Sequence, residues 1–290
     1  MDNVNFTYTL NSDNTFEMSF NPICRPLQDW KTELSLTAKN IRNLTDKPIF
    51  ICLSGGVDGE VVARTFLQEG IEFTALTLRH TAGTNGHDVA YSTKFCEFYN
   101  VPHKIIDFNL EDFITNKIPE YIEQGYYTWR TFRYQQVYLF ELAESLGGTA
   151  VLGGGEQVYR TIDNEICLSF KSDFFMCLEW LKNNKKFHFP FFHMQNPELF
   201  ASYLEDKLIK FMHGDPSYFI NTWDNDASYD KMFVYHSNWT KMKRRKKFNG
   251  FENLKNDQLL FNLIQNRKQE LGEPILQNIP VSVIRKQLGI

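Results

Sequence analysis

The chain has 290 residues, of which 42% are hydrophobic and 23% are charged, and its formal net charge at pH 7 is −4. These values suit one large α/β domain or a core domain with a smaller one, and they give no global signal for nucleic acid or a membrane surface. The five cysteines show no CxxC spacing, which argues against a disulfide framework or a zinc knuckle. A polar, acidic start and the lack of a long apolar run predict a soluble, cytoplasmic protein without membrane contact.

The first residues are expected to form a hairpin followed by a helix. Apolar and polar side chains alternate over residues 4–20 around a polar turn, which is the period-2 pattern of a β-hairpin. Residues 28–45 place Trp30 and Leu34 on or near one face, which predicts a helix with one apolar side.

From residue 47 the pattern alternates between strand and helix, which predicts right-handed βαβ units around a parallel sheet. We therefore expect a doubly wound α/β fold with a mainly parallel, five-stranded sheet. The strands are expected at 48–53, 73–78, 104–108, 149–152 and 165–170, and the helices at 58–69, 88–100 and 134–146. The chain would then divide into a hairpin and helix (1–45), a central domain (46–170) and a mostly helical region (171–290).

The first expected strand ends abruptly in a glycine turn. Its apolar run stops at Ser54-Gly55-Gly56-Val57-Asp58, directly before a helical pattern. Two consecutive glycines let the main chain approach an anion, and the free N–H groups of the helix start favour phosphate there. The stretch lacks the Gly-Lys-Ser/Thr ending of a Walker loop and the three-glycine spacing of a dinucleotide fingerprint. It therefore predicts a phosphate site of another kind.

Polar residues follow the second expected strand. Leu78 ends this strand, and Arg79 and His80 follow it, where they would face a nucleotide, because ligands of open α/β sheets bind there. Arg79 is the more useful of the two through its planar donors. The alternative for His80 is a partly exposed histidine without a role. Residues 85–88 hold an asparagine, a histidine and an aspartate, which either bind a substrate or metal or form a turn and a helix start.

Two arginines precede the helix expected at 134–146. Cations at a helix start oppose the helix dipole, so Arg130 and Arg133 need another reason to lie there. Contact with a substrate or a phosphate is one reason, and a solvated helix face is the alternative. The strand that follows ends in a second glycine turn, 153–155, and then in Glu156.

Both glycine turns resemble motifs of one superfamily. Residues 54–58 resemble the SGGxDS signature of the PP-loop, or N-type, ATP pyrophosphatases, with Gly59 where that family usually has serine. Residues 149–159 resemble the loop that ends the fourth strand in the synthetase domain of asparagine synthetase, with Gln157 in place of one of its two acids. The resemblance covers about half of the chain and does not include a glutaminase domain.

The resemblance implies a site for ATP and Mg²⁺. Mg²⁺ is normally held by one or two carboxylates plus phosphate oxygens, so Asp58 and Glu156 are the expected metal contacts. Asp58, Glu156 and Arg133 are the expected catalytic residues. The expected ATP contacts are Ser54, Gly55, Gly56, Val57, Asp58, Gly59, Leu78, Arg79, Gly154, Lys243 and Arg244.

The last third of the chain is expected to be mostly helical, with helices at 173–186, 196–213 and 256–270 and then an extended tail. His188 and His193 lie in an aromatic stretch without an acid or thiol at metal spacing, so a core or lid position is expected for both. The basic run 241–247 either captures pyrophosphate, contacts nucleic acid or forms a solvated helix. A homo-oligomer also stays open.

As the resemblance implies, the chain would be an ATP-dependent ligase that forms AMP and pyrophosphate. It would adenylate a carboxylate or amide oxygen of an unidentified acceptor, and a nitrogen nucleophile would then displace AMP. Two alternatives stay open. A tRNA or nucleobase sulfur-transfer enzyme would use Cys167 or Cys177. A nucleotide-binding module without catalysis would fit the departures from the family motifs at Gly59 and Gln157.

Overall fold

The computed structural model of the chain describes residues 4–11, 15–128, 130–155, 158–213 and 275–290, together with the single positions 262, 265, 266 and 269. Four of the positions singled out in the sequence, Glu156, Gln157, Lys243 and Arg244, lie outside these residues. The same holds for the basic run 241–247 and for most of the helix expected at 256–270.

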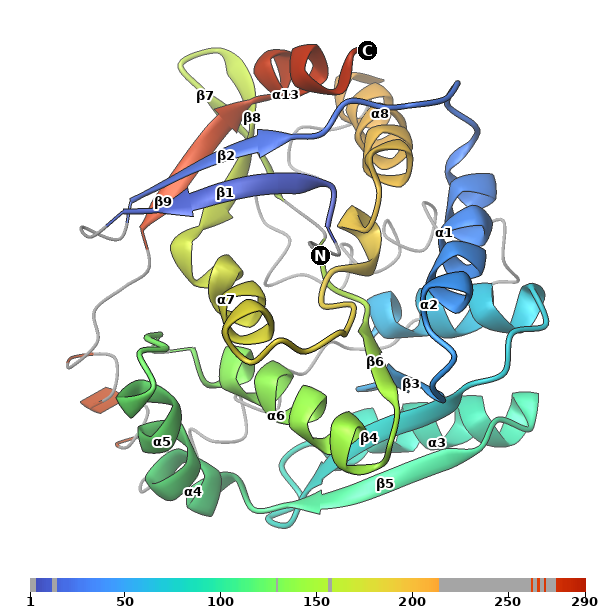
Figure 1. Cartoon of the computed structure of the whole chain (residues 1–290), viewed down its shortest axis with the longest axis vertical. Coiled ribbons are helices and arrows are strands. Elements are labelled where there is room, and N and C mark those ends of the chain that lie inside the picture. Colours follow the sequence, from blue (N-terminus) through green and yellow to red (C-terminus); the bar gives the residue numbers. More distant parts are fainter. Residues whose placement is uncertain are drawn as a thin grey trace.

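A parallel sheet forms the centre of the chain and confirms the expected α/β fold. Its strands are β3 (Ile49–Cys52), β4 (Thr74–His80), β5 (His103–Phe108) and β6 (Thr149–Leu152). They lie in the order β5-β4-β3-β6, and every neighbouring pair is parallel (Figure 1). All four were expected from their short apolar runs between helical patterns.

Helices pack on both faces of this sheet. One face packs with α1 (Trp30–Leu44), α2 (Val57–Gln68) and α3 (Gly86–Tyr99). The other packs with α4 (Leu110–Asp112), a π-helical turn (Phe113–Lys117), α5 (Ile118–Glu123), α6 (Thr131–Ser145) and α7 (Met176–Asn183). Strand pleating sends Ile49 and Ile51 into the first core and Phe50 into the second. Both faces of β3 are therefore apolar, which explains its continuous apolar run.

An extended segment, not the expected fifth strand, lies beside the edge strand β6. The Phe189 N–H donates to the Ala150 carbonyl at 2.9 Å, and the Leu152 N–H donates to the Phe189 carbonyl at 2.9 Å. Isolated bridges join Val151 to Phe189 and Gly153 to Phe191. The free side of β6 is thus covered by residues that follow α7.

The prediction that residues 165–170 complete the parallel sheet was wrong. They form β8 (Glu165–Lys171), which pairs in antiparallel fashion with β7 (Val158–Ile162) and β9 (Leu276–Pro280). The strand itself was expected, but its partner β9 comes roughly a hundred residues later. The tail expected to be extended is instead β9 followed by α13 (Val281–Leu288).

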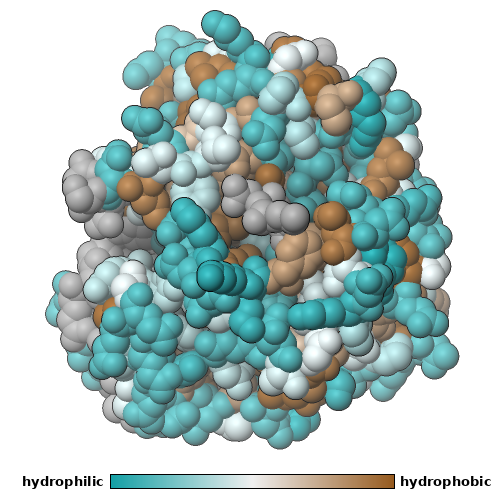
Figure 2. All heavy atoms as spheres, viewed as in Figure 1, coloured by the Kyte–Doolittle hydropathy of each residue, from teal (hydrophilic) through white to brown (hydrophobic). Residues whose placement is uncertain are grey.

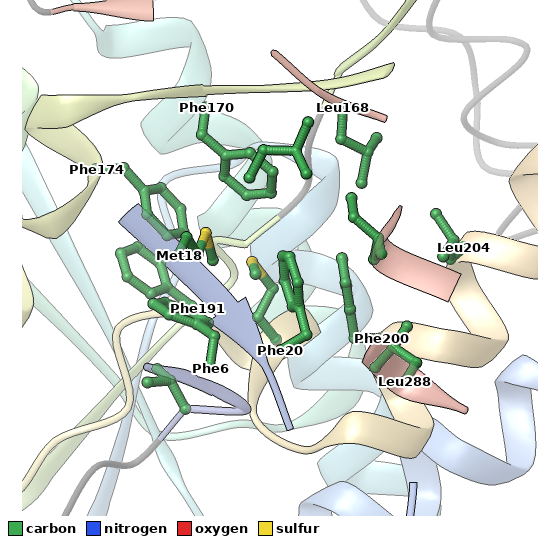
Figure 3. Packing of buried hydrophobic residues seen from close by; sticks show 14 of the residues in the cluster. Phe6, Met18, Phe20, Leu168, Phe170, Phe174, Phe191, Phe200, Leu204 and Leu288 are labelled. Carbon is green, nitrogen blue, oxygen red and sulfur yellow. The ribbon is translucent and has the colours of Figure 1, made fainter. Parts of the chain in front are cut away.

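A third hydrophobic core joins the two ends of the described chain. It contains the predicted hairpin, β1 (Phe6–Leu10) and β2 (Phe16–Phe20), together with β8, β9, α8 (Pro197–His213) and α13. Aromatic rings fill it, and Phe20 stacks on Phe200 with ring centroids 4.9 Å apart (Figure 3). The Phe20 N–H donates to Gln287 Oε1 at 3.0 Å, so β2 is also hydrogen-bonded to α13.

The molecular face in Figure 2 is mostly polar, with apolar residues scattered among hydrophilic ones. In the part of the chain that the structure describes, no helix combines the length and the apolarity needed to cross a membrane.

Two histidines are buried in this fold. His188 is fully buried: its Nδ1 accepts the Ala150 N–H at 3.0 Å, and its ring stacks on Phe140. This confirms the core position expected for His188, and His193 is fully buried as well. His80 is 7% exposed, so the alternative of a partly exposed histidine was wrong. Burial lowers the pKa of both His80 and His188 to about 4.

We expect the free energy of unfolding to fall as the pH drops from 6.5 to 4, by about 3 kcal/mol for each of these two histidines. The unfolded chain takes up these protons near pH 6.5, whereas the folded chain takes them up only near pH 4. Urea unfolding across this range checks the slope. His188→Gln keeps an acceptor for Ala150 and should flatten the slope, and an unchanged slope would contradict the assignment.

Candidate active site

The order of the strands places two loops beside one crevice. The chain passes from β3 to β4 on one side, whereas β6 lies on the other side of β3. Ligands of open α/β sheets bind outside the carboxyl ends of the strands, where the strand order reverses in this way. The glycine turn 54–56 follows β3 and the glycine turn 153–155 follows β6, so both turns border this crevice.

The first turn has a shape that only glycine allows. Gly55 has a φ of +91°, and a Cβ on it would lie 2.1 Å from the Asp88 carbonyl oxygen. The start of α3 therefore presses directly on this loop. Gly56 is the N-cap of α2 and provides no side-chain hydrogen bond, which leaves the amides of the first helical turn to other acceptors. Ser54 is exposed at the same loop.

The second turn lies against the first turn of α2. A Cβ on Gly153 would lie 2.6 Å from the Asp58 carbonyl carbon and 2.7 Å from the Gly59 nitrogen. Only a hydrogen fits in that space, so the two loops meet backbone to backbone. Asp58, at the start of α2, is half-buried beside this contact. The structure thus brings together two loops that lie roughly a hundred residues apart in the sequence.

Gly59 is buried where α2 passes close to β3. A Cβ on Gly59 would lie 3.2 Å from the Cys52 carbonyl oxygen and 3.5 Å from Leu53 Cδ1. A serine would fit only if these neighbours gave by a few tenths of an ångström. The absence of a side chain at Gly59 therefore allows α2 to pass close to the end of β3.

Residues 190–194 pack against the second turn. A Cβ on Gly154 would lie 2.9 Å from the Pro190 carbonyl oxygen, and the Gly154 carbonyl accepts the His193 N–H at 3.2 Å. Gly155 has a φ of +106° and packs against Met194. The turn is consequently held between α2 and this segment.

The end of β4 is tied to its neighbours. Arg79 is half exposed, and its Nε lies 2.7 Å from Asp107 Oδ1 on β5. Leu78 packs against the core around α6. The Asn85 side chain accepts the His80 N–H and donates to the Leu78 carbonyl, both at 2.9 Å. The turn interpretation is confirmed for Asn85.

The two arginines at the start of α6 are mostly buried, so the solvated-face interpretation was wrong. Their side chains are 17% exposed at Arg130 and 12% at Arg133. Both approach Oδ2 of Asp173, which the sequence did not single out, with Nε at 3.3 Å and 3.7 Å. Because α6 leads back into the parallel strand β6, its start lies at the carboxyl edge of the sheet, on the side of the crevice.

Among the described residues, no group of three or more His, Cys, Asp or Glu side chains is arranged to hold a metal ion. A carboxylate at the start of α2, beside helix amides that suit phosphate, nevertheless fits Mg²⁺, which usually keeps several waters and takes one or two carboxylates plus phosphate oxygens. Asp58 is the described residue in that position.

Comparisons with known proteins agree with this geometry. Residues 35–155 match the family model described as asparagine synthase, and this segment contains both glycine turns. The chain is 31% identical over 83 residues to the tRNA-specific 2-thiouridylase MnmA of Acaryochloris marina, and 26% identical over 145 residues to that of Beijerinckia indica. The matches cover 28% and 40% of this chain but only 23% and 33% of those relatives.

Two solved structures are similar at 15% identity. They are the NMN synthetase of Francisella tularensis, with a TM-score of 0.36, and the NH3-dependent NAD synthetase of Campylobacter jejuni, with a TM-score of 0.35. The alignments cover 86% and 84% of this chain, and 96% and 94% of the other two chains. At these TM-scores the structures superpose only loosely.

Residues 35–155 are therefore similar to the asparagine synthase family, and the PP-loop resemblance of the glycine turns agrees with that match. The match covers less than half of the chain.

Proposed function

We propose that the protein is an ATP-dependent ligase that forms AMP and pyrophosphate and adenylates a carboxylate or amide oxygen for attack by a nitrogen nucleophile. One observation carries the proposal. Gly153 lies against the backbone of Asp58 and Gly59, so the two loops of the asparagine synthase segment form one site at the switch in strand order. A shared site of this kind can hold a polyphosphate at one loop and its metal and acceptor at the other.

In the proposed reaction the acceptor oxygen attacks the α-phosphorus of ATP. The bond to the bridging oxygen breaks, pyrophosphate leaves with that oxygen, and an acyl or imidoyl adenylate remains. A nitrogen nucleophile then adds at the activated carbon, loses a proton and displaces AMP. The chain's work would be to position the groups and to stabilise developing charge.

Each loop has a role in this scheme. The turn at 54–56 and the start of α2, including Val57 and Gly59, would bind the leaving pyrophosphate through backbone amides and the Ser54 hydroxyl. Asp58 would hold Mg²⁺ together with Glu156, and a bound Mg²⁺ would neutralise phosphate charge. Arg133 would contact charged oxygens from the start of α6. Leu78, Arg79, Gly154, Lys243 and Arg244 remain predicted ATP contacts.

A sulfur-transfer enzyme is the second candidate, because the similar relatives include tRNA-specific 2-thiouridylases. The thiols of this chain weigh against it. Burial raises the pKa of Cys177 to about 12, and burial also raises that of Cys167. The Cys177 thiol lies in the core and donates to Gln136 Oε1 at 3.2 Å. Neither thiol has the lowered pKa that a sulfur carrier needs.

We expect the double substitution of Cys167 and Cys177 by alanine to leave ATP–pyrophosphate exchange within about twofold of the wild type, because neither thiol lies among groups that would activate it. Exchange is measured at a temperature at which circular dichroism shows both proteins folded. The exposed Cys24 serves as the matched control through Cys24→Ala. Loss of exchange in the double variant alone would contradict the assignment of both thiols to positions outside the site of adenylation.

The proposed function is tested by exchange of labelled pyrophosphate into ATP, with carboxylates, amides and tRNA offered as acceptors in turn. Exchange that depends on a carboxylate or amide, followed by AMP formation when ammonia is added, is the expected result. Exchange that requires tRNA would overturn the amide-forming proposal. Binding of ATP without exchange under every condition would support a nucleotide-binding module.

A further inference from the structure

A buried carboxylate lies between the two arginines of α6. The Asp173 side chain is 1% exposed, and its Oδ2 is approached by Arg130, by Arg133 and, at 3.4 Å, by Thr128 Oγ1. Its other oxygen, Oδ1, is also buried and has no hydrogen-bond partner among the described residues. One carboxylate between two guanidinium groups leaves the cluster with a formal charge of +1.

Stacked rings connect this cluster to the second glycine turn. The Arg133 guanidinium lies 5.6 Å from the centre of the Phe174 ring, and Phe174 follows Asp173 directly in the chain. Phe174 stacks on Phe191 with centroids 4.0 Å apart and planes 9° apart. Figure 3 labels both rings in the same hydrophobic cluster. The Phe191 ring lies 3.2 Å from where a Cβ on Gly154 would be. The arginines are therefore fixed two rings away from the loop.

The cluster also lies where a negative charge is favourable. Arg130 is the N-cap of α6 and makes no side-chain capping bond, so the helix start adds its own positive potential to the two guanidinium groups. Arginine presents planar donors that match the oxygens of a phosphate or a carboxylate. Long side chains must be held in one rotamer to do this, and Asp173 contacts both of them.

We infer that Asp173 is a positioning residue that holds Arg130 and Arg133 toward an oxyanion at the carboxyl edge of the sheet, and that this oxyanion is the pyrophosphate that leaves from the turn at 54–56. The inference rests on the proposed function for the identity of the oxyanion. Pyrophosphate fits better than a single carboxylate because two guanidinium groups can bind its two phosphates together. The carboxylate of an acceptor could bind the same guanidinium groups, and the test below distinguishes it from pyrophosphate.

The test is the binding of inorganic pyrophosphate to the full chain, measured by isothermal titration calorimetry for wild type and Asp173→Asn. The substitution raises the formal charge of the cluster from +1 to +2, so attraction between charges alone would make pyrophosphate bind more tightly. Loss of positioning does the opposite, and we expect binding to weaken about tenfold or more. Tighter or unchanged binding overturns the inference.

Two further variants keep the test decisive. Phe174→Leu changes no charge but removes the ring between Arg133 and Phe191, so it should also weaken pyrophosphate binding, and it replaces Asp173→Asn should that variant fail to fold. The exposed Asp46 gives the matched control, Asp46→Asn, which should bind as wild type does. Succinate serves as the carboxylate probe. If Asp173→Asn and Phe174→Leu weaken the binding of succinate but leave the binding of pyrophosphate unchanged, the arginines bind an acceptor carboxylate, and pyrophosphate is overturned as the oxyanion.

This readout is independent of turnover. If the wild type binds pyrophosphate, Asp173→Asn weakens that binding and no exchange occurs, the positioning role of Asp173 stands and the proposed ligase activity is refuted. If exchange occurs and both Asp173→Asn and Phe174→Leu bind pyrophosphate as the wild type does, the ligase activity stands and the positioning role of Asp173 is refuted.

Discussion

Replacing Asp58 with alanine is expected to lower the rate of ATP–pyrophosphate exchange by about a thousandfold, a loss of the size seen when a group that stabilises transition-state charge is removed. Asp58 lies in the first turn of α2, where the backbone of the second loop meets it at Gly153. It is the described carboxylate that we propose to hold Mg²⁺ against the phosphates. Without this carboxylate, Mg²⁺ would not be held where it can neutralise the charge that develops on pyrophosphate.

The same assay separates the role of the carboxylate from an effect on folding. Asp58→Asn keeps the size of the side chain and removes its charge, so it should lose nearly as much activity as Asp58→Ala. The exposed Glu97, at the far end of α3, is the matched control, because Glu97→Ala removes an acidic side chain away from the crevice. Exchange that survives in Asp58→Asn would mean that another residue holds the metal.

The second large effect is expected at Gly153. Its Cβ in Gly153→Ala would lie 2.6–2.8 Å from backbone atoms of Asp58 and Gly59, and a backbone cannot rotate away as a side chain can. The two loops must separate by several tenths of an ångström or more, so we expect exchange to slow by about a hundredfold. The free energy of unfolding should fall by about 1–3 kcal/mol, as in other overpacked sites.

Gly86→Ala provides the matched glycine control. Gly86 is the first residue of α3, and a Cβ there would have no neighbour within 4 Å. Alanine should keep exchange at the wild-type rate and raise the stability slightly, because it restricts the unfolded chain. Equal activity of Gly153→Ala and Gly86→Ala would show that contact between the loops is not needed for the reaction.

Local patterns predicted most of the central domain. The four parallel strands, the helices between them and both glycine turns were each expected from residues close together in the sequence, such as the apolar run that ends at Ser54. Those patterns report the faces of an element and the residues that end it. They do not indicate which distant element an element pairs with, and β8 pairs with the distant β9 as well as with its neighbour β7.

The candidate site, like the fold, was predicted only where the signal lies in neighbouring residues of the sequence. Asp58 and Gly153 were expected near one ligand because strand ends and glycine turns are visible in sequence. Asp173 was not expected there, since a single acid before two phenylalanines, Phe174 and Phe175, reads as an ordinary helix start. Only the packing of that segment against α6 shows that this acid lies between Arg130 and Arg133.

The third core, which contains the hairpin, has a consequence for biosynthesis. The hairpin formed by β1 and β2 buries Phe6, Phe16 and Met18 against elements that include α13. Roughly 260 residues must be translated between β2 and α13, which takes about 10–50 seconds at ordinary rates of synthesis. Phe174, Phe175 and Phe200, which contact the hairpin, are made earlier in that interval, but until its end the apolar face of the hairpin lacks the part of its cover that α13 provides. The nascent chain is therefore a natural client for chaperones, and the yield of folded protein should depend on how fast the ribosome reaches α13.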